Sequence, residues 1–481
     1  MRSTLQRLEE RPLVWDTALL TDGLSRTETE TVTAARPGQP EKVRVIIDHD
    51  TPAGSVAASA RQALLEAFAR RYSLPFTCGR GIGLHLLMED GTAAPGKVLI
   101  GCGRHTAVVG AAGALGLSLT AEEMVRALET GTVSLEDTPL RRIQLTGTLS
   151  PYESARDLAL TMAAEACPGT VLAIHGPQLS FSQRAEVCAL LAGARVKSVF
   201  FTDEPGGEPL DLSGVRPMAV LPGKPLSQPV PAALIDGIRV SQVFIGGCAG
   251  GTLEALRLTA RLWQGRKVCP YVRVLVAPCT SAVYLQALEE GLRSRGIRTD
   301  FIWLPEGLTR INVKVKGGDE TEINGQGPTV DPVALRALRD KLDRLEAGDI
   351  LVISGSVPAA LSHDVYEQIL ARLEDRGIQF VVDTTRDLLE SALPYHPFLI
   401  KPNNLELAEL FGRTLNSDED IRACAAELQA KGARNVLVSM AGNGSLLLDE
   451  RGGCHRLGVP HGTVRNSVGA GDSMVAGFLA G

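Results

Sequence analysis

The chain reads Asn466-Ser-Val-Gly-Ala-Gly-Asp-Ser-Met-Val-Ala-Gly477 near its end, and this stretch is the best single guide to its fold. Two glycines and an alanine keep bulky side chains away from a turn, so backbone N–H groups there can face an anion. The apolar residues that follow predict a helix, whose N-terminus adds the positive end of its dipole. Asp472 comes directly after the turn, where it can take a proton from an attacking hydroxyl. The stretch therefore favours phosphoryl transfer.

A plainer interpretation of Gly469-Ala470-Gly471-Asp472 needs no ligand. Gly-Ala-Gly can be only a tight loop, and an acid in the first turn of a helix commonly complements the helix dipole. The motif by itself does not separate the two interpretations, because short motifs are only hypotheses. The surrounding sequence has to decide between them.

The stretch from Asn466 to Phe478 resembles the C-terminal signature of the ribokinase-like sugar kinases, most closely the bacterial 1-phosphofructokinase and tagatose-6-phosphate kinase branch. Similar motifs extend upstream to about Gly296 in the family's order. They are Thr299–Trp303, Thr309–Lys314, Thr321–Asn324 with Gly327-Pro328, Ser354–Pro358, Lys401–Glu406 and Ser439-x-x-Gly442-x-Gly444. The first two look like the strands that meet the sugar phosphate in that branch. Several motifs in the right order imply a shared fold.

The resemblance implies a role for each part of the final motif and of the nucleotide side. Asp472 is the expected catalytic base, and the N–H groups around the preceding turn are the expected anion hole. The residues expected to form the anion hole and to bind ATP are Gly469, Ala470, Gly471, Ser439, Gly442, Gly444, Lys401, Asn403 and Glu406. Asn403 and Glu406 are expected to organise Mg²⁺, directly or through water.

The sugar phosphate is expected to bind at Arg310, Asn312 and Lys314. For Arg310 and Lys314 a solvated strand face is an equally good interpretation, since exposed cations need no partner.

The periodicity of the same region predicts an α/β fold independently of the resemblance. Asp331-Pro332 predicts a helix start, with a capping acid followed by a proline in the first turn. Short apolar runs alternate with helical stretches, and these runs are 350–353, 380–382, 398–400 and 436–438. Such alternation predicts a parallel sheet covered on both faces. The motifs follow the strands, where open α/β sheets bind ligands.

The first half of the chain carries a different set of motifs. In chain order they are Val45–Asp50, Phe68–Tyr72, Gly101–Thr106, Phe244–Gly251, Trp263–Val268 and Arg273–Pro278. Together they resemble the aconitase and 3-isopropylmalate dehydratase large-subunit family, which implies an aconitase-like α/β/α module. Asp48, His49 and His105 match functional positions of that family.

The resemblance is weaker where the family's chemistry resides. Those enzymes hold a 4Fe–4S iron–sulfur cluster through three cysteines, and here only Cys248 matches one of them. No Cys-x-x-Cys occurs among the nine cysteines, although a cluster needs converging thiolates. Asp48-His49 can equally be a polar strand end, and Cys248 a buried thiol. The remaining histidines stand singly and are interpreted as structural.

The two resemblances divide the chain into an aconitase-like module, 1–288, and a ribokinase-like module, 289–481. The helix expected over 282–295 runs from one family pattern into the other, which is unusual because domain junctions normally fall in flexible segments. Both modules are expected to be incomplete: the kinase-like part in its N-terminal portion and its final helix, the dehydratase-like part in its cluster-binding third. A truncated or recombined reading frame is one explanation.

Composition is that of a soluble globular protein. The 481 residues are 44% hydrophobic and 22% charged, with a net charge of −6 and 4% aromatic residues. This balance argues against nucleic acid as a partner. No apolar run is long enough to cross a membrane, and the start of the chain is not a signal peptide. Nine unpatterned cysteines fit the reducing cytoplasm.

The leading functional hypothesis is ATP-dependent phosphorylation of a sugar phosphate, most like the conversion of fructose 1-phosphate to fructose 1,6-bisphosphate. The second is an iron–sulfur hydro-lyase of the 3-isopropylmalate dehydratase or aconitase type. The third is a non-catalytic or truncated fusion. The expected partners are a sugar phosphate and a nucleotide, with a homodimer left open.

Overall fold

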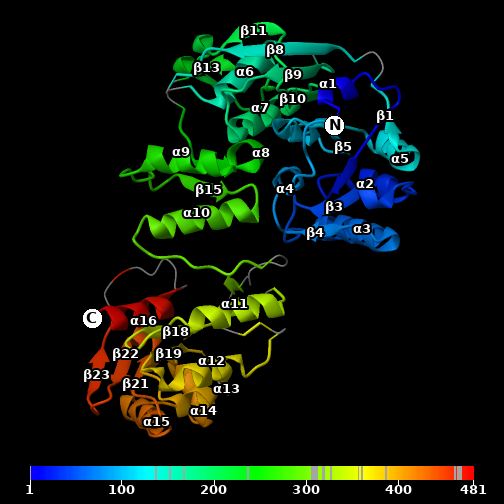
Figure 1. Cartoon of the computed structure of the whole chain (residues 1–481). Helices are drawn as coiled ribbons and strands as arrows, with labels where there is room; N and C mark the ends of the chain where they lie inside the picture. Colours follow the sequence, from blue (N-terminus) through cyan, green and yellow to red (C-terminus); the bar gives the residue numbers. More distant parts are fainter. Residues whose placement is uncertain are drawn as a thin grey trace. The chain divides into compact units, whose positions relative to one another are not determined.

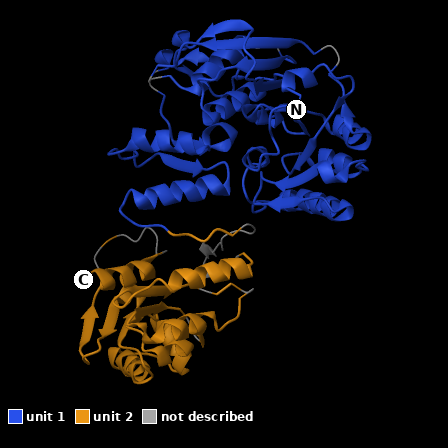
Figure 2. Cartoon of the chain, viewed as in Figure 1, with its two compact units in different colours: residues 1–299 blue, residues 300–481 orange. Residues whose placement is uncertain are grey.

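The computed structural model describes most of the chain and divides it into two compact units, unit 1 at residues 1–299 and unit 2 at residues 300–481 (Figure 2). The described residues are 2–135, 138–150, 153–165, 168–235, 238–304, 312–316, 320–324, 328–355, 357–358, 361–384, 387–459, 462 and 469–481, with only the backbone in 312–316 and 320–324. The predicted junction at 288/289 falls ahead of the boundary between the compact units. As a boundary between two modules it stays a prediction.

Unit 1 contains a five-stranded parallel sheet with the strand order β4-β3-β2-β5-β6. Figure 1 labels three of its strands, β3, β4 and β5. Its strands are β2 (Thr17–Thr21), β3 (Val43–Ile47), β4 (Phe76–Cys78), β5 (Val98–Gly101) and β6 (Leu115–Ser118). The connecting elements are α1 (Thr4–Arg7), α2 (Arg26–Thr33), η1 (Pro40–Lys42), α3 (Val56–Tyr72), α4 (Gly83–Glu89), η2 (Thr106–Ala112) and α5 (Ala121–Thr130). A small antiparallel pair joins β1 (Leu13–Val14) to β7 (Thr132–Val133).

A second parallel sheet in unit 1 has the order β10-β9-β8-β11. Its strands are β8 (Leu140–Thr146), β9 (Val171–His175), β10 (Ser198–Phe201) and β11 (Glu208–Asp211). The elements around it are α6 (Ala155–Glu165), α7 (Phe181–Gly193), η3 (Leu212–Gly214), the antiparallel pair β12 (Met218–Ala219) and β13 (Val230–Pro231), and η4 (Ala232–Leu234). Leu19 and Leu99 from the first sheet share one buried cluster with Leu145 and Leu172 from the second. The two sheets are therefore held by a common core.

The last part of unit 1 is a two-stranded parallel sheet with helices. Here β14 (Gln242–Gly246) pairs with β15 (Arg273–Ala277), accompanied by α8 (Gly247–Gly250), α9 (Leu253–Trp263) and α10 (Ser281–Arg293). The continuous helix α10 confirms the helix expected across the meeting point of the two family patterns. Neither α9 nor α10 contains a buried residue among those described.

Unit 2 is built on a six-stranded sheet with the order β18-β19-β20-β21-β22-β23. Its strands are β18 (Ile350–Ser354), β19 (Gln379–Asp383), β20 (Leu399–Ile400), β21 (Asn435–Ser439), β22 (Ser445–Leu448) and β23 (Cys454–Leu457). The first four strands are mutually parallel, and the last two are antiparallel additions. The predicted parallel sheet, and with it the α/β fold class, is confirmed.

Helices cover both faces of this sheet. They are α11 (Pro332–Leu342), α12 (Val365–Leu373), α13 (Asp387–Ala392), α14 (Asn404–Phe411), α15 (Asp418–Ala430) and α16 (Ala470–Ala480), with short turns η5 (Glu374–Arg376), η6 (Leu393–Tyr395) and η7 (Ala441–Asn443). On one face, α11–α15 close a large core. On the other, Val475 of α16 packs on Val381, Leu399 and Leu437 of three neighbouring strands. Figure 1 shows α16 across the sheet from α14 and α15.

Two further sequence expectations have different outcomes. The helix start at Asp331-Pro332 is confirmed, and the Asp331 side chain accepts a hydrogen bond from the N–H of Ala334 at 2.7 Å. The strand expected at Thr299–Trp303 is wrong, because these residues form no regular structure. Lys341 of α11 holds this segment instead, donating from Nζ to the carbonyl oxygen of Asp300 at 2.7 Å. The antiparallel ribbon β16 (Asn312–Lys316) and β17 (Glu320–Asn324) follows it.

No helix among the described residues has the length and apolar character that crossing a membrane requires.

We predict that Gly432→Ala destabilises unit 2 far more than Gly412→Ala. Both glycines have positive φ angles, +132° and +58°, so both alanines carry a backbone penalty of about 1–2 kcal/mol. A Cβ at Gly432 would also stand 2.0 Å from the carbonyl oxygen of Leu393, whereas nothing lies within 4 Å of one at Gly412. Urea unfolding followed by a unit 2 signal checks the order. Equal losses for the two variants would contradict the close contact.

Candidate functional site

The four parallel strands of unit 2 end at one edge of the sheet, and the predicted kinase residues follow those ends. Lys401 comes directly after β20, and Ser439 is the last residue of β21, directly before the expected nucleotide loop. Asn403 and Ser439 form an isolated parallel bridge, in which the N–H of Ser439 donates to the carbonyl oxygen of Pro402 at 3.1 Å. The carboxyl edge of the sheet thus brings together segments that are far apart in the sequence.

Helix α16 begins at this motif. Gly469 is its N-cap, with φ of +80°, a conformation that glycine adopts without strain. No described side chain caps the first turn, so its N–H groups stay available to an anion. Asp472 is exposed in that first turn. The N–H and hydroxyl of Ser473 both donate to the carbonyl oxygen of Gly469, at 2.9 and 2.8 Å. Asn466-Ser467-Val468 lie outside the described residues.

A buried lysine lies against the start of α16. Lys401 is only 8% exposed, and a Cβ at Gly471 would stand 3.2 Å from its Nζ. The ammonium therefore adds a full positive charge to the positive end of the helix dipole. Its counter-ion is Asp383, at the end of β19, whose Oδ1 lies 3.1 Å from Nζ. A lysine and a free helix N-terminus at one place form an anion-binding arrangement.

Sequence reasoning missed Asp383. The sequence offered one sign of it, since Asp383 is an acidic residue directly after the apolar run 380–382, at the carboxyl end of a predicted strand. That signal is weak, because many strands end in a polar residue. The register made it specific: Val382 pairs with Ile400, so the next residues, Asp383 and Lys401, are neighbours at the sheet edge.

Asn403 and Glu406 form a capping box at the start of α14. Asn403 Oδ1 accepts from the N–H groups of Leu405 and Glu406, at 2.9 and 2.8 Å. Glu406 Oε2 accepts from the N–H of Asn403 at 2.8 Å. This arrangement satisfies helix N–H groups that would otherwise lack partners. An organising role toward Mg²⁺ stays a prediction.

The expected nucleotide loop follows β21. Met440 donates its N–H to the carbonyl oxygen of Gly444 at 2.8 Å and closes a tight turn. Gly444 has φ of +88°, and a Cβ there would stand 2.1 Å from the carbonyl oxygen of Leu457, whereas Gly442 is open to solvent.

Of the residues expected to bind the sugar phosphate, Asn312 and Lys314 lie in β16, and Arg310 lies outside the described residues.

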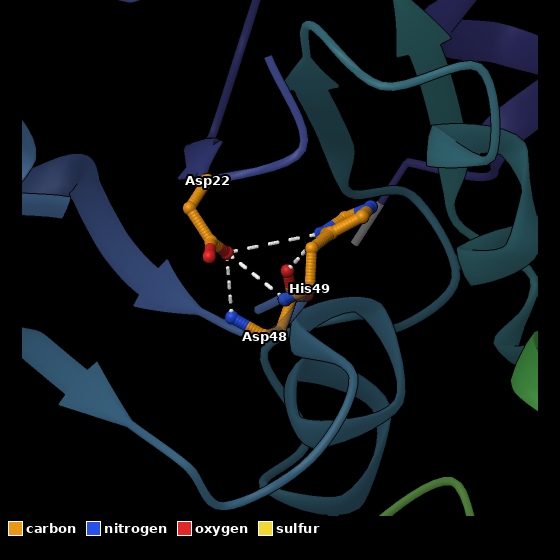
Figure 3. A group of neighbouring side chains, drawn as sticks. All are labelled: Asp22, Asp48 and His49. Carbon is orange, nitrogen blue, oxygen red and sulfur yellow. Dashed lines mark hydrogen bonds and ion pairs between the residues drawn. The ribbon is translucent and has the colours of Figure 1, made fainter. Parts of the chain in front are cut away.

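In unit 1 the structure gathers Asp48, His49 and Asp22, of which Asp22 was not expected (Figure 3). Asp22 Oδ1 accepts from the N–H groups of Asp48 and His49, at 2.8 and 2.9 Å. Its Oδ2 accepts from the N–H of Asp50 at 3.1 Å and from Gln62 Nε2 at 3.0 Å. Burial alone would raise the pKa of Asp22, but these donors hold it below its ordinary value.

His49 completes the cluster. Its Nδ1 lies 2.5 Å from Asp48 Oδ1, and this hydrogen bond raises the pKa of His49. Asp48 Oδ2 accepts from the N–H of Gly83 at 2.7 Å. One ligand atom from each of Asp22, Asp48 and His49 comes within 4.8 Å of the others. Because protein donors already engage both carboxylates, the cluster is explained as the hydrogen-bonded turn that follows β3.

The other predicted remnants lie around the start of α8. Cys248 is half-buried, and burial raises the pKa of its thiol to about 11, so the thiol is protonated near neutral pH. His85, which is buried, donates from Nε2 to the carbonyl oxygen of Cys248 at 3.0 Å. His105 is exposed and directly precedes η2. Among the described residues, no group of three close metal-ligand side chains includes Cys248.

The fold places a lysine and an uncapped helix start at the sheet edge of one α/β unit, and comparison with known proteins identifies the family of each unit. Residues 284–481 match the pfkB family carbohydrate kinases. Residues 22–192 and 227–308 match the aconitase family. The chain belongs to the aconitase family in its N-terminal part and to the pfkB carbohydrate kinase family in its C-terminal part. Both family resemblances seen in the sequence are confirmed.

Relatives occur for each part. The chain is 45% identical over 190 residues to 1-phosphofructokinase of Bacillus subtilis strain 168, covering 40% of this chain and 62% of that protein. It is 34% identical to 1-phosphofructokinase of Borreliella burgdorferi, covering 45% and 72%. It is 30% identical to the homoaconitase large subunit of Thermus thermophilus, covering 53% and 68%. A solved structure of a putative phosphofructokinase from Staphylococcus aureus is 41% identical, covering 40% and 62%, with a TM-score of 0.36.

The chain thus spans 62% of the length of the Bacillus subtilis relative. The two family matches overlap over 284–308, in α10 and the segment after it. The roles of individual site residues stay predictions.

We predict that unit 1 loses stability on acidification partly through His85. Burial holds its pKa below the ordinary value, so the unfolded chain takes up this proton first. Stability is therefore full above the unfolded pKa of about 6.5 and falls with pH until the folded histidine also titrates. Thermal unfolding of unit 1 between about pH 7.5 and about pH 5 should show a smaller loss for His85→Gln than for the unaltered chain. His363→Gln, at an exposed position of unit 2, is the control, and an unchanged slope in His85→Gln would refute the assignment.

Proposed function

We propose that unit 2 transfers a phosphoryl group from ATP to a sugar phosphate, most like the conversion of fructose 1-phosphate to fructose 1,6-bisphosphate. The observation that carries the proposal is the buried Lys401 ammonium beside the uncapped start of α16. The pfkB family membership and the 1-phosphofructokinase relatives support the same chemistry.

In this proposal Asp472 accepts the proton of the attacking hydroxyl. It is exposed in the first turn of α16, which leaves its carboxylate accessible to a substrate. The N–H groups at Gly469–Gly471 and the Lys401 ammonium stabilise charge on the transferring phosphoryl group. Their direction is set by the packing of Val475 on the sheet, so little reorganisation is needed when charge develops.

The nucleotide would lie along the loop that contains Ser439, Gly442 and Gly444, whose open glycine leaves room for a ligand. Asn403 and Glu406 would organise Mg²⁺, which neutralises phosphate charge when bound. Only Oε2 of Glu406 is used in the capping box, which leaves Oε1 to act on the metal directly or through water. Arg310 and Lys314 would hold the phosphate of the sugar substrate.

A second candidate function for the chain is an iron–sulfur hydro-lyase of the 3-isopropylmalate dehydratase type, in unit 1. The paired Asp48 and His49 favour it, as does membership of the aconitase family. The missing Cys-x-x-Cys, which would supply two of the three cluster thiolates, counts against it, so we propose that the dehydratase-like unit is degenerate. A non-catalytic fusion is the third alternative. A cytoplasmic location, and assembly as a homodimer, belong to the proposal as expectations.

The kinase proposal predicts that Asp472→Asn abolishes most turnover. Loss of a positioned general base typically costs about 10²–10⁴-fold in rate, while ATP binding should persist. Release of ADP in the presence of fructose 1-phosphate is the measurement. Glu419→Gln, which changes an exposed acid in the first turn of α15, is the matched control and should leave the rate unchanged. Full activity in Asp472→Asn would remove Asp472 from the mechanism.

For unit 1 we predict no stable iron–sulfur cluster in a single chain, because one thiolate cannot replace three. Anaerobic reconstitution, followed by iron and sulfide analysis and visible absorbance, tests this. Cys248→Ser and Cys188→Ser form a matched pair, since Cys188 is fully buried in α7. Stoichiometric iron and sulfide that Cys248→Ser removes and Cys188→Ser retains would show that the prediction is wrong.

A further inference from the structure

Lys401 and Asp383 form an unusually protected ion pair. Their side chains are 9% and 17% exposed. Every other ion pair described in unit 2 has at least one side chain that is more than a third exposed, as in Lys431–Glu390 at 47% and 46%. Removing two charges from water costs more than their attraction commonly returns. Stability is therefore a poor explanation for this pair.

The surroundings make the position of the ammonium more costly. Nζ lies beside Gly471 in the first turn of α16, so the positive end of the helix dipole faces a positive side chain. A cation near a helix N-terminus is unfavourable unless an anion stands between or beside them. Asp383 is the only anion described in contact with Lys401.

Asp383 itself is held by the backbone and does not depend on Lys401 for its place. It ends β19, and its carbonyl oxygen accepts from the N–H of Gly355 after β18 at 3.2 Å. Thr384, the next residue, is buried and donates to the carbonyl oxygen of Gly355 at 3.3 Å. The carboxylate thus stays at the sheet edge when the lysine moves, since the lysine has a flexible stem and the aspartate does not.

We propose that Asp383 is a positioning residue that keeps the Lys401 ammonium at the start of α16 until a nucleotide phosphate replaces it as the counter-ion. The inference deepens the proposed kinase function and rests on it. Asp383 and the terminal phosphate group compete for one ammonium, and the N–H groups of α16 favour the phosphate. Glycine at 471 leaves room for the ammonium, because a Cβ there would stand 3.2 Å from Nζ and crowd it.

The test compares the binding of metal-free ATP and of AMP to the full chain by calorimetry. Lys401→Met should weaken ATP binding about tenfold or more and leave AMP unaffected, because it removes a charge-assisted contact with the terminal phosphate group. Asp383→Asn should strengthen ATP binding, by about threefold or more, because the competing carboxylate is gone. The double variant should match Lys401→Met, because Asp383 acts only through Lys401.

The exposed pair Lys431–Glu390 supplies the controls. Lys431→Met and Glu390→Gln should change neither affinity. Asp383→Asn can fail to fold because it leaves the Lys401 ammonium buried without a partner. In that case the double variant Asp383→Asn/Lys401→Met, which removes both charges, has to fold. Its affinities for ATP and for AMP have to match those of Lys401→Met. ATP and AMP affinities that change in parallel would assign the pair a structural role and overturn the inference.

The outcomes also separate this inference from the kinase proposal. An unaltered chain that binds no ATP overturns both. The expected affinity pattern without ADP release from fructose 1-phosphate overturns the kinase proposal alone. Turnover with an unchanged ATP affinity in Asp383→Asn overturns the positioning role alone.

Discussion

A lysine side chain that is buried at the end of a strand has to be neutralised, and this constraint organises the edge of unit 2. Lys401 is only 8% exposed, and the positive end of the α16 dipole lies beside its charge. Parallel strands end at one edge, so the neighbouring strand delivers Asp383 to the same place. The arrangement puts one ammonium, its Asp383 counter-ion and the uncapped start of α16 at the same edge of the sheet. An anionic substrate group is the natural replacement.

In unit 1, by contrast, the clustered acidic side chains are already hydrogen-bonded within the protein. Its carboxylates at Asp22 and Asp48 already accept hydrogen bonds from backbone N–H groups, and His49 is bound to Asp48. Its Cys248 thiol is kept protonated by burial. Hydrogen bonds within the protein are thus enough to explain why these groups lie together. This contrast, more than the number of retained family residues, is why the proposed activity resides in unit 2.

The meeting of the two families lies in an ordered helix. Both family matches include α10 from residue 284 onward, and the helix runs without a break from Ser281 to Arg293. Its capping threonine, Thr280, donates to Glu89 of unit 1 at 2.7 Å, so its start is fixed in the aconitase-like part. The backbone hydrogen bonds of a helix join residues four positions apart, so the helix can continue where two sequence families meet.

The sequence by itself determined the α/β class, the four parallel strands, the helix start at Asp331 and the glycine turn before α16, because these follow from local spacing and turn chemistry. It also named Lys401, Gly471 and Asp472 through their motifs. The prediction of a strand at Thr299–Trp303 was wrong, because a strand needs a pairing partner and the local sequence does not show whether one exists. Only the tertiary structure decided that Asp383 pairs with Lys401 and that Asp22 binds the turn after β3. Register between strands and the burial of a charge depend on contacts distant in the chain.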